Sequence, residues 1–335
     1  MPRLSPRETA IRDAEIIRLY SVEKLSCNKI APMFNMTVPS VHKRLVKHGV
    51  KTRSNKENSR KYFCDEDFFE VIDTEDKAYW LGFIYADGYV SSNRKYGQKV
   101  VGLLLSNEDY DHVRKFNSSI KSSYPIKTYE SLNTFGEREY TSSYARVVIT
   151  SDKMFNDLVD KGVVEHKTNV LKFPSVDILP VDLQRHFIRG YFDGDGCITW
   201  TGNEISRVNL KIVGTPEFIK GMLDASGVTA RIELRYKDRD NVVTAVLARK
   251  HGLIKFLDYM YKKSSIHLGR KYNKYVEVMQ GLQSIQDKSN MIIERRNEIL
   301  SYIREHPNET YAQMARKLGL NSKQAIQWYV STYLK

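Results

Sequence analysis

The sequence predicts an α+β protein built from two similar halves, with small all-helical domains at both ends. Segments 80–88 and 188–196 are both apolar runs that close with an Asp-Gly pair. After each of them, the apolar patterning predicts the same order of elements, αββαββα. We therefore expect two repeats related by a pseudo-twofold axis, because this order is typical of an α+β protein rather than of a parallel crossover fold.

The distribution of charge indicates the kind of partner. The 335-residue chain has a formal net charge of +13. Residues 1–66 carry 14 Lys and Arg against 7 Asp and Glu, and residues 288–335 carry 8 against 4. Basic ends favour a polyanion such as nucleic acid as the partner, and a basic surface that serves only solubility is the alternative.

Cysteine content and hydropathy exclude other classes of protein. Three cysteines are too few and too scattered for a disulfide framework or a zinc cluster. No apolar stretch resembles a signal peptide or reaches the length of a membrane span. We therefore expect an intracellular protein that binds no membrane.

Residues 1–52 are predicted to form a helical domain. The small Ala31 precedes a turn at Asn35, a residue that tolerates left-handed dihedral angles. Thr37 is a suitable N-cap for the basic helix that follows. This is the helix-turn-helix pattern, although an ordinary three-helix subdomain has the same helices. The candidate DNA-binding residues of this domain are Ser40, His42, Lys43 and Lys47.

A polar and basic stretch without periodicity follows at residues 53–67. It predicts a linker in which Arg53 would lie along DNA as part of an arm. A solvated tether that contacts nothing is the alternative.

The two repeats occupy residues 68–170 and 171–283. Their last motif aspartates, Asp87 and Asp195, are 108 positions apart, which suits one small domain per repeat. Each motif helix leads directly into a strand. The remaining predicted strands are 100–105, 126–129, 144–149, 208–213, 230–236 and 242–248.

Residues 290–335 are predicted to form a second helix-turn-helix domain. A polar break at 283–290 precedes a helix at 292–304. Ala315 and Gly319 take the two positions that a helix-turn-helix motif restricts most in size. The candidate DNA-binding residues here are Asn321, Lys323, Gln324 and Gln327.

Small residues recur four positions apart in both motifs, as Gly82 with Ala86 and Gly190 with Gly194. Glycine inside a helix costs about 0.8–1 kcal/mol relative to alanine. The cost is explained if the two helices meet with their backbones almost in contact. The alternative is two ordinary buried helices, each closed by an Asp-Gly turn.

Such a contact would bring Asp87 and Asp195 together at the ends of the two helices. Two carboxylates this close repel each other unless divalent cations share the site. A small number of oxygen ligands favours Mg²⁺, with another divalent ion such as Mn²⁺ as the alternative. Paired carboxylates in a basic protein point to phosphodiester chemistry.

The two segments resemble the motifs of the LAGLIDADG homing endonucleases in their single-chain, two-motif form. On that resemblance, Asp87 and Asp195 take the place of the catalytic, metal-binding acids. Gly88 and Gly196 close the motifs and join the aspartates as candidate metal ligands.

Two positions depart from the family motif or are unusual in it. Tyr85 stands where the consensus has its earlier aspartate, whereas the second motif keeps Asp193. Arg189 is unusual for a helix at such an interface, and we expect it on an outward face.

The resemblance implies a site-specific endonuclease that acts as a monomer on double-stranded DNA with a long, roughly pseudo-palindromic target. Mg²⁺ held by the two aspartates would assist hydrolysis of one phosphodiester bond in each strand. Lys167 and Lys271 match the basic residue that family members use near the scissile phosphate. Two alternatives remain open: a DNA-binding regulator on the same scaffold that does not cut, and an RNA maturase that assists intron splicing.

The resemblance also implies that eight strands form a DNA-binding saddle. Its hairpins would place basic side chains against bases and phosphates. The candidate contacts are Arg94, Lys95, Arg138, Arg207, Lys237 and Arg239.

Overall fold

The computed structural model describes residues 5–53, 61–93, 97–136, 138–200, 207–234 and 241–334. The chain divides into two compact units, Met1–Phe63 and Cys64–Lys335. Each unit is described by itself. No helix in the described part of the chain combines the length and the apolar character needed to cross a bilayer.

The described part of the first unit contains three helices, as predicted: α1 (Pro6–Ser21), α2 (Cys27–Met33) and α3 (Val38–Lys47). The turn between α2 and α3 passes through Asn35, whose φ of 51° lies in the left-handed region. An apolar core joins the helices and consists of Ile16, Leu19, Tyr20, Cys27, Ile30, Ala31, Val41 and Leu45.

One buried carboxylate ties α1 to the end of α3. Asp13 accepts hydrogen bonds from Arg44 Nη1 at 2.6 Å and from His48 Nε2 at 3.1 Å. Burial would raise the pKa of Asp13, but the bonds from His48 and Arg44 hold it below its ordinary value. The orientation of α3 on α1 is therefore fixed by charge as well as by apolar packing.

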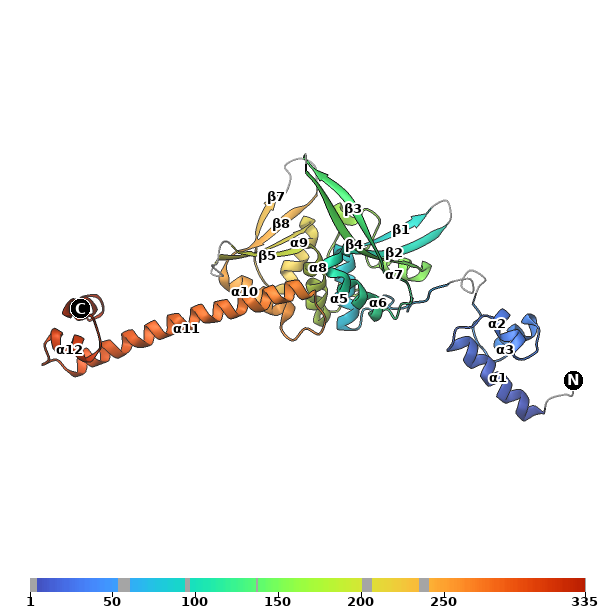
Figure 1. Cartoon of the computed structure of the whole chain (residues 1–335), viewed down its shortest axis with the longest axis horizontal. Helices are drawn as coiled ribbons and strands as arrows, with labels where there is room; N and C mark the ends of the chain where they lie inside the picture. Colours follow the sequence, from blue (N-terminus) through green and yellow to red (C-terminus); the bar gives the residue numbers. More distant parts are fainter. Residues whose placement is uncertain are drawn as a thin grey trace. The chain divides into compact units, whose positions relative to one another are not determined.

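The second unit contains two antiparallel four-stranded sheets with the same strand order (Figure 1). The first has the order β1-β2-β4-β3 and the second the order β5-β6-β8-β7. This confirms the predicted α+β class and its internal repeat. The strands are β1 (Gly88–Asn93), β2 (Gln98–Ser106), β3 (Lys127–Phe135), β4 (Arg138–Thr150), β5 (Gly196–Trp200), β6 (Val208–Gly214), β7 (Arg231–Leu234) and β8 (Val243–Leu247).

Helices complete each repeat in the predicted order. The motif helices are α5 (Glu75–Ala86) and α8 (Gln184–Asp195). The other helices of the repeats are α6 (Tyr110–Ser119), α7 (Asp152–Asp160), α9 (Pro216–Ser226) and α10 (Lys250–Tyr261). Each sheet buries one face against helices, as the alternation in β6 shows, where Val208, Leu210 and Ile212 are buried.

The hairpin β3–β4 is longer than its apolar pattern predicts. The ladder extends from the pair Lys127–Arg146 to the pair Phe135–Arg138. Most residues of its outer part are polar or charged, and the exceptions Leu132 and Phe135 are too few to give an apolar signal. The predicted strands therefore ended where the buried residues of the hairpin end.

The expected polar break at 283–290 is wrong, because α11 (Gly269–Glu305) is one continuous helix of 37 residues. The segment 283–290 contains neither Pro nor Gly. Side chains four positions apart also support it, since Gln283 donates to Asp287 at 2.7 Å and Gln286 to Asn290 at 3.0 Å.

Two short helices, α12 (Tyr311–Lys317) and α13 (Lys323–Tyr333), pack against the last turns of α11. Thr310 and Gln313 form a capping box at the start of α12. Gly319 supplies the turn with a φ of 64°. The shared core consists of Ile299, Ile303, Met314, Ala315, Leu318 and Ile326.

The backbones of α5 and α8 touch where the helices cross. A Cβ built on Gly82 would overlap the carbonyl oxygen of Phe187, and a Cβ built on Gly190 would overlap that of Tyr79. The overlap is with backbone atoms, which cannot swing aside. The two glycines are therefore what allows this crossing.

We expect Gly82→Ala to lower the free energy of unfolding of the second unit by about 1–3 kcal/mol, because the methyl group forces the two helices apart. Gly252→Ala is the matched control, since Gly252 lies in α10 and a Cβ there meets no atom within 4 Å. That control should be neutral or stabilise by up to about 1 kcal/mol. Urea denaturation followed by circular dichroism measures both, and equal stability of the two variants would contradict the proposed contact.

Candidate active site

The two motif aspartates leave the crossing helices at adjacent ends. Asp87 is the C-cap of α5, and Asp195 is the last residue of α8. A Cβ built on Gly194 would lie 3.0 Å from Asp87 Oδ2 and would overlap Ala86 Cβ. Both aspartates are exposed, so the close helix ends present two carboxylates to solvent.

The charge of Asp87 is disfavoured in this position. The surrounding protein displaces water from its carboxylate, and the neighbouring Asp195 adds repulsion, which together raise the pKa of Asp87 to about 6. Lys271 and Lys167 lower it in part. A divalent cation between the carboxylates would relieve the same repulsion.

Both predicted lysines reach the ends of the motif helices. Lys167 Nζ donates to Gly88 O at 2.6 Å. Lys271 Nζ donates to Phe192 O at 2.7 Å, Gly194 O at 2.9 Å and Gly196 O at 2.6 Å.

Burial lowers the pKa of both ammonium groups, and the nearby aspartates raise it in part. The result for Lys271 is a pKa of about 8, and for Lys167 it is a value below the ordinary one. Each lysine therefore brings a positive charge to the aspartate pair at some cost in solvation.

The prediction that Gly88 and Gly196 serve as metal ligands does not fit this geometry. Their carbonyl oxygens accept hydrogen bonds from the two ammonium groups, and an ammonium on a carbonyl repels a second cation. The carboxylates of Asp87 and Asp195 remain as candidate ligands. They fit Mg²⁺, which is commonly held by one or two carboxylates and keeps several waters. Among the described residues, no group of three or more His, Cys, Asp or Glu is placed to hold a metal ion.

Residues 182–261 match the family model of the LAGLIDADG-like domain. The match covers 80 of the 335 residues. The matched residues begin just before α8 and end with α10, so they cover most of the second repeat. No curated protein sequence matches the chain significantly.

Solved structures with partial similarity include I-SmaMI and I-GzeII. The meganuclease I-SmaMI bound to uncleaveable DNA is 13% identical, with a TM-score of 0.40 over 68% of this chain and 95% of that one. I-SmaMI bound to its uncleaved DNA target with calcium ions is 14% identical, with a TM-score of 0.39 over 65% and 93%. I-GzeII in complex with its DNA target is 12% identical, with a TM-score of 0.42 over 63% and 91%.

The expectation that Arg189 faces outward is wrong. Its side chain is 0% exposed and lies between the two repeats of the chain. The guanidinium donates to Glu75 Oε1 at 2.7 Å and to the carbonyls of Met260 and Ile266, both at 2.8 Å. One carboxylate and two carbonyls thus pair the charge, which is how a buried arginine is tolerated.

Asp193 is fully buried two positions before the exposed Asp195. It accepts hydrogen bonds from Tyr261 Oη at 2.5 Å, Leu268 N at 2.7 Å and Tyr79 Oη at 2.7 Å. Burial raises the pKa of Asp193, while these donors favour its charged form. The corresponding Tyr85 in α5 donates to the carbonyl of Lys161 instead.

The helical ends of the chain present most of their predicted residues to solvent. Ser40, Lys43 and Lys47 are exposed on α3, and His42 is exposed but shares a 3.1 Å hydrogen bond with Thr52 Oγ1. At the other end, Asn321, Lys323, Gln324 and Gln327 are exposed at or on α13. Sequence reasoning missed Trp328, which is 53% exposed one turn after Gln324.

Arg53 does not belong to a free arm, which corrects the prediction. Its guanidinium donates to Lys24 O at 2.7 Å and to Leu25 O at 2.5 Å, and it stacks over the Tyr20 ring at 4.3 Å. Those carbonyls lie in the segment between α1 and α2 and need donors. Arg53 therefore holds the chain after α3 against that segment.

The predicted hairpin contacts are only partly described. Arg94, Lys95, Lys237 and Arg239 lie outside the described residues, and Arg138 begins β4 with a side chain that is not described. Arg207 is exposed just before β6. Sequence reasoning missed the exposed Arg146, Lys211 and Arg231, because which strand residues face outward depends on register.

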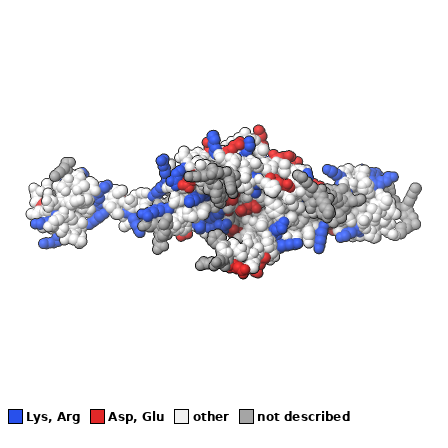
Figure 2. Space-filling model, turned by 90° about the horizontal axis from the view of Figure 1, so that it is seen from above, with Lys and Arg blue, Asp and Glu red and all other residues white. Residues whose placement is uncertain are grey.

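Basic side chains are interspersed with acidic ones on the face that Figure 2 shows. Arg146 on β4 also donates from Nε to Tyr89 Oη at 2.9 Å, close to the start of β1. The outer surface of the sheets therefore offers separate basic positions, which suits contacts to individual phosphates or bases.

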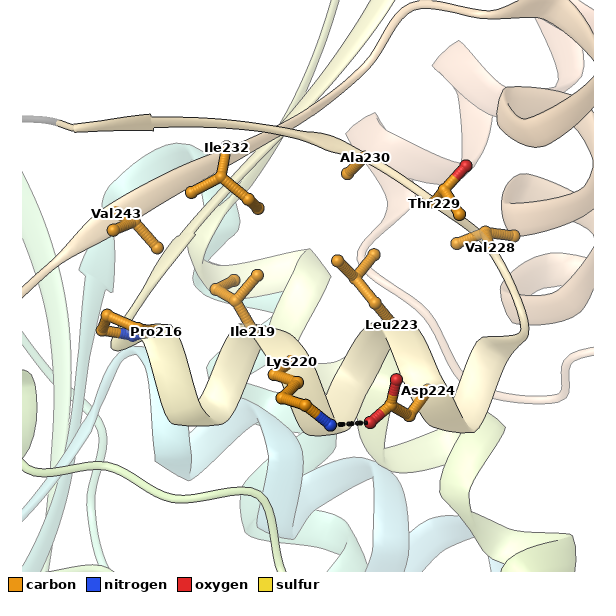
Figure 3. A pocket seen from close by; sticks show the side chains of 10 residues that line it. All are labelled: Pro216, Ile219, Lys220, Leu223, Asp224, Val228, Thr229, Ala230, Ile232 and Val243. Carbon is orange, nitrogen blue, oxygen red and sulfur yellow. Dashed lines mark hydrogen bonds and ion pairs between the residues drawn. The ribbon is translucent and has the colours of Figure 1, made fainter.

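A separate hollow of about 310 Å³ lies between α9 and strands β7 and β8 (Figure 3). Its lining is mostly aliphatic, with Ile219, Leu223 and Ile232 pointing toward it, and with Lys220 paired to Asp224 at 2.7 Å. None of the predicted site residues lines it.

We expect Asp87→Asn to raise the thermal midpoint of the metal-free protein at pH 7.5 by about 2–4 °C, the shift that about 1 kcal/mol produces in a chain of this size. The pKa of Asp87 is about 6 in the folded state, against about 3.9 in an unfolded chain. The penalty for ionisation is therefore complete above pH 6 and absent below about pH 4.

Scanning calorimetry in EDTA at pH 4 and pH 7.5 measures this difference. The exposed Asp177 supplies the control variant, Asp177→Asn, which should change neither midpoint. An equal gain for Asp87→Asn at both pH values would refute the electrostatic account.

Proposed function

We propose that the protein is a site-specific endonuclease that cuts both strands of DNA with the help of a divalent metal ion, Mg²⁺ in the first place. The observation that carries the proposal is the pair Asp87 and Asp195, delivered together by backbones in contact at Gly82 and Gly190. Two exposed carboxylates whose charges repel, with an ammonium group beside each helix end, suit a cation and a phosphodiester.

The chain's own residues would hold and neutralise the reacting groups. Asp87 and Asp195 would hold the metal, which supplies Lewis-acid polarisation of the scissile phosphate when bound. Lys167 and Lys271 keep positive charge beside the carboxylates. Each repeat contributes one aspartate and one lysine, which matches one cut in each strand of a duplex.

Binding of the duplex would use the outer faces of the two sheets. Arg146, Lys211 and Arg231 are exposed on β4, β6 and β7 and would contact phosphates or base edges. The exposed residues of α3 and α13 would bind further along the same DNA. Linked modules gain affinity through effective concentration, so the target site would be long.

A DNA-binding regulator that does not cut is the second candidate. The exposed faces of α3 and α13 favour it, because both fit a recognition helix. The retained aspartate pair favours the nuclease, since binding alone needs no repelling carboxylates.

The two candidates predict different results with a target selected from randomised duplex DNA. We expect the protein to cut the selected duplex with Mg²⁺ and not with EDTA. Asp87→Asn and Asp195→Asn should each slow double-strand cutting by at least about a hundredfold, while the Kd for the duplex stays within about threefold. Asp177→Asn should cut like the unmodified protein.

Gel assays of cutting and of binding on the same duplex distinguish the outcomes. Full cutting by either variant would eliminate the two-aspartate mechanism. Tight binding by the unmodified protein without any cut would establish the regulator instead.

A further inference from the structure

We infer that the two lysines have different roles: Lys271 is a positioning residue that fixes the end of α8, and Lys167 is the lysine available to a DNA phosphate. The two cutting centres are therefore unequal. This inference rests on the proposed nuclease function and assigns roles within its site.

All three hydrogen-bond donors of Lys271 are used. A lysine ammonium group has three N–H donors and no acceptor. Lys271 directs them at three carbonyl oxygens, those of Phe192, Gly194 and Gly196, at 2.6–2.9 Å. It is 4% exposed, so no donor remains for a phosphate unless this arrangement breaks.

The three acceptors explain what Lys271 does in place of phosphate binding. The last carbonyls of a helix lack partners within the helix, and they form its negative end. Lys271 bonds Gly194 O and Gly196 O, and it adds a second donor to Phe192 O, which also accepts from the Gly196 N–H. The position of the Asp195 carboxylate therefore depends on Lys271.

Lys167 differs from Lys271 both in the number of carbonyls that it bonds and in its exposure. Among the hydrogen bonds between described residues it donates to one acceptor, Gly88 O at 2.6 Å. It is also partly exposed, whereas Lys271 is buried. Two of its donors can turn toward a phosphate while the third stays on the end of α5.

The difference between the lysines follows from the residue at the sixth position of each motif. Asp193 accepts the backbone N–H of Leu268, the N-cap of α11, and Lys271 lies in the first turn of that helix. This bond holds the start of α11 on α8 and aims Lys271 at the helix end. Tyr261 Oη holds the same carboxylate from α10 at 2.5 Å.

The first motif has no equivalent bond to a helix that carries its lysine. Tyr85 donates to the carbonyl of Lys161, six positions before Lys167. Between them the chain passes through His166, whose φ is 54°, and not through a helix. Lys167 thus follows an irregular segment, which Glu165 ties to Ser92 Oγ at 3.0 Å, and its ammonium group bonds one carbonyl where that of Lys271 bonds three.

The test compares Lys167→Met with Lys271→Met on a duplex labelled separately on each strand. We expect Lys167→Met to slow the cutting of one strand by at least about tenfold at saturating Mg²⁺, with the other strand and the half-saturating Mg²⁺ concentration unchanged. Lys271→Met should raise the half-saturating Mg²⁺ concentration by at least about tenfold, and saturating Mg²⁺ should restore most of the rate.

Arginine variants distinguish the roles of Lys167 and Lys271 independently. Lys167→Arg should keep the rate within about tenfold, since guanidinium also binds phosphate. Lys271→Arg should behave like Lys271→Met, because the larger group does not fit among three carbonyls. Lys220 is exposed on α9 and supplies the control variant Lys220→Met. Equal effects of the two methionine substitutions on both strands, or normal cutting by Lys271→Arg, would overturn the inference.

If the unmodified protein binds the duplex without cutting it, the proposed function is overturned. A thermal measurement then still tests the division of roles between the two lysines. In metal-free buffer, Lys271→Met should lower the thermal midpoint by at least about 5 °C, because the ammonium group that bonds three carbonyls at the end of α8 is lost. Lys167→Met should change it by about 1 °C at most. Equal shifts would overturn the division of roles.

Discussion

The contact between the backbones of α5 and α8 is the constraint on which the rest of the structure depends. Gly82 and Gly190 each face a carbonyl of the other helix, with no room for a side chain. The helix ends then come together and two carboxylates meet, and loss of water around Asp87 together with repulsion from Asp195 raises the pKa of Asp87. The site is therefore a consequence of packing: wherever the helices cross this closely, their terminal residues must share one space.

Buried polar groups make the two halves unequal around this contact. The carboxylate of Asp193 and the guanidinium of Arg189 are fully buried and fully paired, and both hold the segment between α10 and α11. Tyr85 provides a single bond at the matching place in α5. One fold repeated twice thus carries two different supports for its lysines, which is where a difference between strands would arise.

The sequence predicted the elements whose signal is local and left out those decided by tertiary contacts. Apolar periodicity and the paired glycines were enough to predict the repeat order and the α+β class. The burial of Arg189 depends on Glu75 and on two carbonyls from distant segments, so its charge alone suggested solvent. Arg53 and the uninterrupted α11 were mispredicted for a related reason, since polar composition resembles a linker whether or not the chain is ordered.

The central claim is that Asp87 and Asp195 together hold divalent metal. A crystal structure of the protein with its DNA target and Mn²⁺, with anomalous data collected at the manganese edge, tests it most directly. The account predicts anomalous peaks about 2.2 Å from carboxylate oxygens of both aspartates, and none at the carbonyls that Lys271 occupies. Manganese bound elsewhere while both carboxylates stay without a metal would contradict the account.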